Sequence, residues 1–183
     1  MTNANLQFRI ATTDDAPRIR QLVEAAFQAE DSRPDWTADM ELGRNFRIGI
    51  DEILPKITGP DSDILIATDD NDALVASVAI WRRDASLARF ALLSVDQTRQ
   101  QGGVGRKVLA HAEDYCRREW GVDKFGLNAL STRQELISWY GRCGYRKTGE
   151  LTPFPVEKIN GRDVPEELCF VELEKELGAE RAK

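Results

Sequence analysis

The sequence is poor in the residue types that mark several common classes of protein. It contains one histidine and three cysteines, and the odd number and uneven spacing of the cysteines predict neither a disulfide framework nor a zinc site. No apolar run approaches the ~20 residues that a membrane-spanning helix needs. The first residues lack the basic and long apolar regions of a signal peptide. We therefore expect a cytoplasmic protein that binds no membrane and no metal.

Acidic residues outnumber basic ones. The 183-residue chain has 31 Asp and Glu against 25 Lys and Arg, a net charge of −6 at pH 7, which argues against a broad nucleic-acid-binding surface. Its 42% hydrophobic and 31% charged residues are typical of a globular protein. The length predicts a single domain over residues 1–175, with residues 176–183 as a frayed tail.

Hydrophobic periodicity predicts the order of the secondary-structure elements. A first helix is capped by Thr13 or Asp14 and buries apolar residues as far as Phe27. The other predicted helices cover residues 50–57, 105–119 and 132–142, and the strands cover residues 6–10, 64–67, 74–81, 87–95, 124–130, 145–151 and 168–173. The order suits a mixed sheet with helices on both faces. A central crevice is expected where strands 87–95 and 124–130 separate.

A glycine-rich segment, Gln100-x-x-Gly103-x-Gly105, joins strand 87–95 to the next helix. Because glycine has no Cβ, a ligand can lie directly on this backbone. The first turn of the following helix offers unpaired N–H groups and the positive end of the helix dipole. Arg99 and Lys107 add positive charge nearby. These features together predict a phosphate-binding loop.

Two familiar phosphate-binding patterns do not fit this loop. The dinucleotide fingerprint requires a glycine where Val108 stands, and the nucleotide phosphate loop requires a lysine where Arg106 stands. A second group of residues follows about 35 positions later. Strand 124–130 leads into helix 132–142, and Tyr140-Gly141-Arg142-Cys143-Gly144-Tyr145 follows.

With these two motifs in this order, the chain resembles the GCN5-related N-acetyltransferase (GNAT) superfamily over roughly residues 5–151. The resemblance implies an α/β (α+β) fold with a mixed, mostly antiparallel sheet of six to seven strands flanked by helices. An acyl-CoA crevice would lie between the splayed central strands. It also implies acetyl-CoA as co-substrate, with backbone amides of the loop holding its pyrophosphate and side chains adding contacts. The loop residues concerned are Gln100, Gln101, Gly102, Gly103, Val104, Gly105 and Arg106.

Further roles follow from the same resemblance. The backbone of Leu93 and Val95 is expected to pair with pantetheine, since an exposed strand edge can bind an amide chain. A backbone N–H of Leu92 or Leu93 is the expected oxyanion donor. Tyr140 matches the position of the family's acid, which protonates the leaving thiolate; the alternative is that it is a core aromatic residue.

The chain departs from the family at one place. Many relatives carry Asn-x-x-Ala seven residues before the tyrosine, where this sequence has Arg133-Gln134-Glu135-Leu136. Arg133 could replace the lost contact with the cofactor. Cys143 is predicted to be a packed thiol rather than a nucleophile, which favours direct attack of the amine on the thioester.

The acceptor amine and the general base are not indicated by a motif. Candidates for substrate binding are Glu30, Arg33 and Trp36, in the irregular stretch where the family builds its acceptor site, and Asn128 on strand 124–130. Asn128 is either a substrate-facing group or hydrogen-bonded to a neighbouring strand. His111 falls beside the apolar stripe of its helix and is predicted to be a surface residue.

The leading hypothesis is an acetyl-CoA-dependent N-acetyltransferase that acts on a primary amine of a small molecule. The alternative enzymatic function is acetylation of a protein or peptide amine. A CoA-binding regulatory module that does not catalyse is the alternative of another class. No nucleic-acid partner is expected, and the architecture allows a homodimer through the last strands or a sheet edge.

Overall fold

The computed structural model describes residues 5–29, 46–155 and 168–178. The helices are η1 (Thr13–Asp15), α1 (Ala16–Gln28), α3 (Ile50–Thr58), η2 (Gln97–Gly102), α4 (Val104–Trp120) and α5 (Gln134–Arg142), where η marks a 3-10 helix. The strands are β1 (Gln7–Ile10), β2 (Ser62–Thr68), β3 (Leu74–Arg82), β4 (Leu87–Val95), β5 (Lys124–Leu130), β6 (Arg146–Pro153) and β7 (Cys169–Glu176). These elements follow the order predicted from the sequence.

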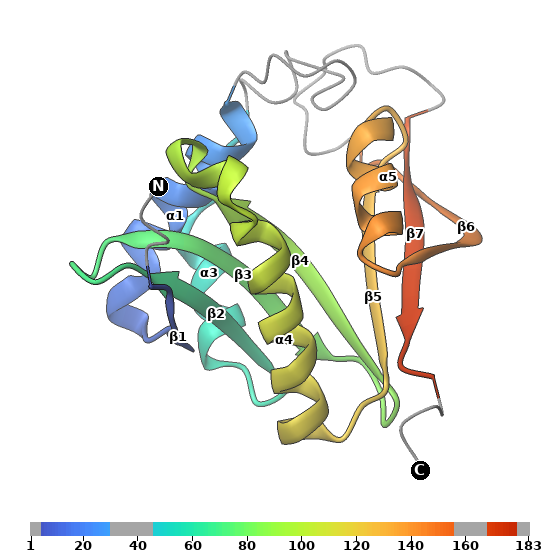
Figure 1. Cartoon of the computed structure of the whole chain (residues 1–183), viewed down its shortest axis with the longest axis horizontal. Helices are drawn as coiled ribbons and strands as arrows, with labels where there is room; N and C mark the ends of the chain where they lie inside the picture. Colours follow the sequence, from blue (N-terminus) through green and yellow to red (C-terminus); the bar gives the residue numbers. More distant parts are fainter. Residues whose placement is uncertain (1–4, 30–45, 156–167, 179–183) are drawn as a thin grey trace.

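The strands form one seven-stranded sheet in the order β1-β2-β3-β4-β5-β7-β6. All neighbouring strands are antiparallel except β4 and β5, which run parallel and are connected by α4. Helices α4 and α5 cover one face of the sheet, and α1 and α3 lie on the other face of its β1–β4 half (Figure 1). The predicted fold, a mixed and mostly antiparallel sheet flanked by helices, is confirmed.

Each face of the sheet has its own hydrophobic core. The predicted apolar stripe of α4 is fully buried and packs in the larger core with β3, β4, β5 and α5; its residues are Val108, Leu109, Ala112 and Cys116. Ile19 and Ile53 bring α1 and α3 into a second core against β2. The two cores hold β2 to β4 between helices, and the larger core packs β5 against α4, so that β4 and β5 support a site at their ends.

The boundaries of most elements differ from the predicted ones by one or two residues, and two further differences are larger. The short polar turn expected after β4 forms the 3-10 helix η2, which begins where the Asp96 carboxylate accepts a hydrogen bond from the Thr98 N–H. At the other end of the chain, β7 continues through Glu176, and the Leu177 N–H donates to the Asp123 carbonyl at 2.8 Å. Ordered pairing therefore extends slightly beyond the expected domain end at residue 175.

Among the described helices, none combines the length and the apolar character needed to cross a membrane. The three cysteines are free thiols; Cys116 is buried, and Cys143 and Cys169 are half-buried. Within the described residues no three His, Cys, Asp or Glu side chains come together in a way that could hold a metal ion.

Candidate active site

Strands β4 and β5 separate soon after they begin. They are paired at only three positions, from Leu87 opposite Lys124 to Arg89 opposite Gly126, and then diverge (Figure 1). Both strands point toward the same edge of the sheet, so the segments that follow them, η2 and the start of α5, lie at that edge. In open α/β sheets, ligands bind in the crevice outside the carboxyl ends of such strands. The expected separation of these strands is confirmed.

The backbone of β4 presents Leu93 and Val95 to this opening. The Asp96 N–H donates to the Val75 carbonyl on β3 at 2.8 Å. Because hydrogen-bonding direction alternates along an antiparallel strand, Val95 and Leu93 direct their N–H and C=O groups away from β3, toward β5. These are the two residues predicted to pair with pantetheine, and they have the required orientation.

A β-bulge interrupts β4 at Leu92. The β3–β4 register shifts between Ser77 and Ala79, and Leu92 has a φ of 54°, in the left-handed region. A branched residue rarely adopts this conformation, which costs about 1–3 kcal/mol and is concentrated at functional sites. The bulge also reverses the alternation: Phe90 packs in the core on the α4 side before it, and Leu93 and Val95 pack there after it. Thus the backbone is distorted where the oxyanion donor, Leu92 or Leu93, was predicted.

The glycine loop forms the entry to α4. Gly103 has a φ of 71°, and a Cβ built on it would meet no atom within 4 Å, so that its outer face is open. The Lys107 N–H makes the first bond of the helix, to the Gly103 carbonyl at 3.1 Å. The N–H groups of the preceding residues, Val104, Gly105 and Arg106, therefore have no partner within the helix. Such a row of amides attracts an anion.

Three polar side chains around this loop contact other parts of the protein. Gln100 folds back so that its Nε2 lies 3.4 Å from the Val95 carbonyl. Arg106 is exposed, and its Nη2 lies 3.5 Å from the Arg142 carbonyl on α5. Arg99, which was expected to add charge at the phosphate, instead pairs with Asp69 at 2.9 Å. The side chain of Gln101 lies outside the described part of the structure, and Gly102 is exposed.

The start of α5 forms the opposite wall. Thr132 precedes this helix, and its Oγ1 is the one buried side-chain oxygen or nitrogen of the described residues that has no hydrogen-bond partner. Leaving such a group unpaired costs about 1–3 kcal/mol, so the Thr132 hydroxyl is a candidate contact for a ligand. Arg133 is half-buried at the N-cap of α5. Trp139 comes from the next turns of α5 and would be 3.4 Å from a Cβ at Gly105, which brings the two predicted motifs into contact.

Tyr140 lies inside the larger core, 6% exposed, with its ring against those of Trp139 and Tyr145. Burial raises the pKa of Tyr140 to about 12, and the positive charge of Arg133 opposes this shift. The phenol is therefore protonated at neutral pH. Within the described residues no hydrogen bond is made by its hydroxyl. The ring is therefore packed in the core, as the alternative interpretation held, and the hydroxyl remains able to donate a proton to a ligand, as the catalytic role requires.

These features fit acetyl-CoA. The open Gly103 surface and the first amides of α4 match a diphosphate. The strand edge at Leu93 and Val95, where Gln100 contacts the Val95 carbonyl, matches an amide chain. The unpartnered Thr132 hydroxyl supplies a further polar contact. When bound, the co-substrate would supply an acyl thioester; the protein supplies the amides, the strand edge and a phenol.

The face of β5 and β7 that lies opposite α4 and α5 carries a compact polar cluster that the sequence did not reveal. Glu172 on β7 accepts hydrogen bonds from Arg89 Nη1 at 2.8 Å, Asn128 Nδ2 at 3.0 Å and Thr152 Oγ1 at 2.7 Å. Side chains from the four strands β4, β5, β6 and β7 thus meet at one carboxylate. Gly126 leaves room for the Arg89 side chain, because a Cβ there would lie 3.0 Å from Nη1.

The cluster is electrically neutral and largely buried. The Arg89 and Glu172 side chains are 12% and 11% exposed. Burial would raise the pKa of Glu172, but hydrogen bonds from Asn128, Thr152 and Arg89 outweigh it and hold that pKa below its usual value. Glu172 is therefore a poor general base. Asn128 is satisfied by the neighbouring strand, one of the two roles considered for it.

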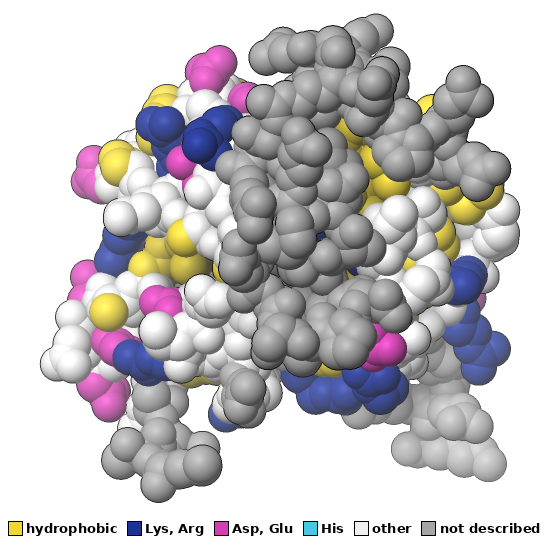
Figure 2. All heavy atoms as spheres, turned by 90° about the horizontal axis from the view of Figure 1, so that it is seen from above, with side chains coloured by type: hydrophobic (Ala, Val, Ile, Leu, Met, Phe, Trp, Pro, Cys, Tyr) yellow, Lys and Arg dark blue, Asp and Glu magenta, His cyan; other side chains and the backbone are white. Residues whose placement is uncertain are grey.

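Two phenylalanine rings lie further along this side of the sheet, toward the ends of the strands. Phe170 stands opposite Leu130 in the ladder and stacks on Phe154, with ring centroids 5.7 Å apart. In the view from above, hydrophobic side chains gather on the right, over the β5–β7 half, and basic side chains line the lower edge (Figure 2). A ligand lying here would meet polar groups at Glu172 and apolar groups beyond them.

Several other predicted residues remain to be placed. Glu30, Arg33 and Trp36 lie outside the described residues. His111 lies beside the stripe of α4 as expected, but it is half-buried rather than on the surface, because its ring stacks on Phe8 at 4.3 Å. Burial lowers its pKa.

Cys143 lines a cavity of about 230 Å³ between α4 and β7, away from the bulge. Burial raises the pKa of the Cys143 thiol, which suits the predicted packed thiol and not a nucleophile. In the same cavity the Glu113 carboxylate binds Lys175 at 2.9 Å and accepts a hydrogen bond from Tyr145 at 2.8 Å, so these charges are already paired.

Comparison with known proteins agrees with this geometry. Residues 60–147 match the model of the acetyltransferase (GNAT) domain family. The matched segment runs from β2 to the start of β6 and includes the loop, the bulge and Tyr140. It is a GNAT acetyltransferase domain. The resemblance inferred from the two motifs and the assignment to the acyltransferases are thereby confirmed.

Solved structures show the same fold over nearly the whole chain. A chimera of the Vibrio cholerae spermidine N-acetyltransferase with hSSAT superposes with a TM-score of 0.66 at 15% identity, covering 93% of this chain and 95% of that one. An IAA acetyltransferase from Bacillus cereus gives 0.66 at 15% identity, covering 94% and 100%. The Vibrio cholerae spermidine N-acetyltransferase with CoA and spermine gives 0.65 at 16%, covering 92% and 94%. No curated protein matches the sequence significantly.

Proposed function

We propose that this protein transfers the acetyl group of acetyl-CoA to a primary amine of a small molecule. The observation that carries the proposal is the separation of β4 from β5 beside the amides at the start of α4. This combination offers a diphosphate site and a strand edge for pantetheine within one crevice. It would place the thioester at the Leu92 bulge.

The reaction would proceed by direct attack in a ternary complex. The amine nitrogen bonds to the thioester carbon while the carbon–sulfur bond breaks. A backbone N–H at the bulge, from Leu92 or Leu93, stabilises the charge on the carbonyl oxygen, an effect typically worth about 3–4 kcal/mol. The Tyr140 phenol, protonated at neutral pH, gives its proton to the departing sulfur. The surplus proton of the amine passes to water, and the phenolate recovers a proton from water. No nucleophilic residue is required.

The acceptor would approach from the face of β5 and β7 that lies opposite α4 and α5. There the neutral Arg89–Glu172 pair and Asn128 offer both donors and acceptors, and Phe170 offers an apolar wall. The structural relatives include enzymes that acetylate spermidine, an aliphatic polyamine, which supports a small amine. Glu30, Arg33 and Trp36 remain candidates for the same site.

A thiol-release assay tests the proposal. The protein is mixed with acetyl-CoA and a panel of primary amines, and free CoA thiol is measured with and without each amine; calorimetry measures acetyl-CoA binding separately. Amine-stimulated thiol release supports the transferase. Acetyl-CoA binding without release for any amine, including peptide N-termini and lysine peptides, would indicate a CoA-binding module instead. Release with peptides alone would indicate a protein acetyltransferase.

A further inference from the structure

The side-chain carboxylate of Asp69, at the turn between β2 and β3, accepts three hydrogen bonds. Its Oδ1 accepts from the Asn71 and Ala73 N–H groups at 2.9 and 3.0 Å, and its Oδ2 accepts from Arg99 Nη2 at 2.9 Å. The Asp69 side chain is 9% exposed. The first two bonds shape the turn itself. The third reaches 30 residues along the chain to η2, the helix that leads into the glycine loop.

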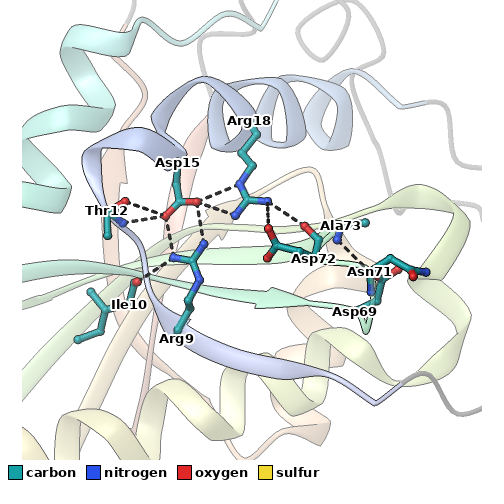
Figure 3. A network of polar contacts seen from close by, with 9 residues as sticks. All are labelled: Arg9, Ile10, Thr12, Asp15, Arg18, Asp69, Asn71, Asp72 and Ala73. Carbon is teal, nitrogen blue, oxygen red and sulfur yellow. Dashed lines mark hydrogen bonds and ion pairs between the residues drawn. The ribbon is translucent and has the colours of Figure 1, made fainter.

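The turn that carries Asp69 is itself firmly anchored. Arg18 on α1 donates to the Asp72 carbonyl at 2.9 Å and to the Asp15 carboxylate at 2.7 Å, and Asp15 also binds Arg9 at 2.8 Å (Figure 3). Asp15 is 4% exposed. This network connects β1, the start of α1 and the β2–β3 turn, so Asp69 is held by a rigid part of the molecule.

Gln100 also holds η2 to β4, since its Nε2 donates to the Val95 carbonyl at 3.4 Å, but among the described residues no ion pair joins η2 to α4. The two helices are connected through Gly102 and Gly103. A Cβ at Gly103 would meet nothing within 4 Å, and one at Gly102 would meet only Val104, at 4.0 Å. Glycine permits many backbone conformations, so this joint does not define where η2 lies relative to the first amides of α4.

We propose that Asp69 is a positioning residue for the co-substrate. Through Arg99 it fixes η2 against the β2–β3 turn, and thereby fixes the amides between Gly102 and Arg106 in the geometry that receives the diphosphate. Arg99 acts through this contact and is not a ligand of the phosphate. The inference rests on the proposed function, since it concerns the same diphosphate site.

The two possible roles of Arg99 predict opposite effects of removing the Asp69 charge. If Arg99 bound the diphosphate, Asp69→Asn would release a competing carboxylate, and acetyl-CoA would bind as well as before or more tightly. If Arg99 positions η2, the same variant loosens the loop and weakens binding. Asparagine keeps a carbonyl oxygen for the Asn71 and Ala73 N–H groups, so the turn is preserved.

Asp84 provides a matched control. It lies between β3 and β4, where its Oδ1 accepts from the Ser86 and Leu87 N–H groups at 2.8 and 2.9 Å, the same kind of turn. Asp84 has no contact with the loop among the described residues. Asp69→Asn should raise the Kd and KM for acetyl-CoA about three- to tenfold, the effect of a loss of one partly exposed ion pair. Asp84→Asn should change neither. In both variants kcat should stay within about twofold of the wild type. The melting temperatures of Asp69→Asn and Asp84→Asn should agree with each other.

Arg99→Gln and the double variant with Asp69→Asn complete the test. If the two residues act as one clamp, each single variant and the double variant weaken acetyl-CoA binding to the same degree. Multiplicative effects, or an Asp69→Asn variant that binds acetyl-CoA like the wild type or better, would overturn the positioning role and leave the proposed function intact. A wild-type protein that binds no acetyl-CoA in calorimetry would overturn both.

Discussion

Gly103 and Gly121 lie at the two ends of helix α4 in nearly the same backbone conformation, with φ values of 71° and 68°. At each of them a Cβ would meet no atom within 4 Å. Gly103 is the N-cap, beside the first amides, and Gly121 is the C-cap, where its N–H donates to the Arg117 carbonyl at 3.1 Å. The two positions are alike in conformation and space, but only Gly103 lies where the diphosphate is proposed to bind.

Gly103→Asp is expected to abolish acetyl-CoA binding. The carboxylate would occupy the surface on which the diphosphate is expected to lie, and its charge would repel the phosphates. Folding should suffer little, because Asp is a favoured N-cap residue and tolerates the left-handed region better than most residues. Calorimetry with acetyl-CoA measures the loss.

Gly121→Asp is the control for this prediction. It introduces the same side chain at the same φ, 17 residues of helix away, and should leave acetyl-CoA affinity unchanged. Tight binding by Gly103→Asp, or equal losses in both variants, would show that the loop does not hold the diphosphate.

Glu172→Gln is expected to destabilise the fold by about 2–4 kcal/mol, because it leaves the largely buried Arg89 cation without its counter-charge. The Asp61–Arg82 pair has the same distance, 2.8 Å, but its side chains are 55% and 43% exposed. Asp61→Asn should therefore cost less than about 1 kcal/mol. Urea unfolding of both variants at pH 7 makes the comparison. Equal costs would mean that burial does not strengthen the Arg89–Glu172 interaction.

Much of the fold was accessible from sequence because local patterns determine it. The stripe of α4 and the alternating residues of β1 repeat at the periods of a helix and a strand, and Gly121 ends its helix as glycine commonly does. The glycine loop was recognisable for the same reason, since its residues are close together in the chain.

The remaining features depend on contacts between distant residues. Glu172 meets Arg89 across 83 positions, and Arg99 meets Asp69 across 30. No local pattern marks either pair. The bulge at Leu92 was also invisible, because leucine gives no indication of a positive φ. Its cause is the β3–β4 register, which only the assembled sheet defines.

Asp15 predicts a pH dependence of stability. The hydrogen bond from Arg9 is the largest of the effects that hold the pKa of this buried carboxylate well below its usual value of 3.8. A lowered pKa in the folded state means that the charged form stabilises the protein above about pH 4, and that this contribution is lost as the pH falls further. Asp15→Asn should cost about 2–4 kcal/mol at pH 7.

The cost of Asp15→Asn should stay constant between pH 7 and 5 and shrink progressively below about pH 4, as the wild-type carboxylate becomes protonated. Urea unfolding at pH 7, 5 and 3 measures it. Asp14→Asn, at the exposed neighbouring position, should cost little at every pH. A cost for Asp15→Asn that is the same at pH 3 as at pH 7 would contradict the charged role of Asp15.

Tyr140→Phe should lower kcat tenfold or more while the Kd for acetyl-CoA barely changes, a loss of about 1.4 kcal/mol of transition-state stabilisation. Because burial raises the pKa of Tyr140 to about 12, the phenol stays protonated throughout the practical pH range. The wild type should therefore show no alkaline fall in kcat from this residue up to about pH 10, and the profile of Tyr140→Phe should run parallel to it.

Tyr145→Phe separates catalysis from packing. Tyr145 lies in the same core with its ring 6.0 Å from that of Tyr140, but its hydroxyl donates to Glu113 at 2.8 Å. Removing that hydroxyl should lower the melting temperature and leave kcat unchanged. Equal kcat in the wild type and Tyr140→Phe would exclude the phenol as the acid, and the sulfur would then have to leave as a thiolate or take its proton from water.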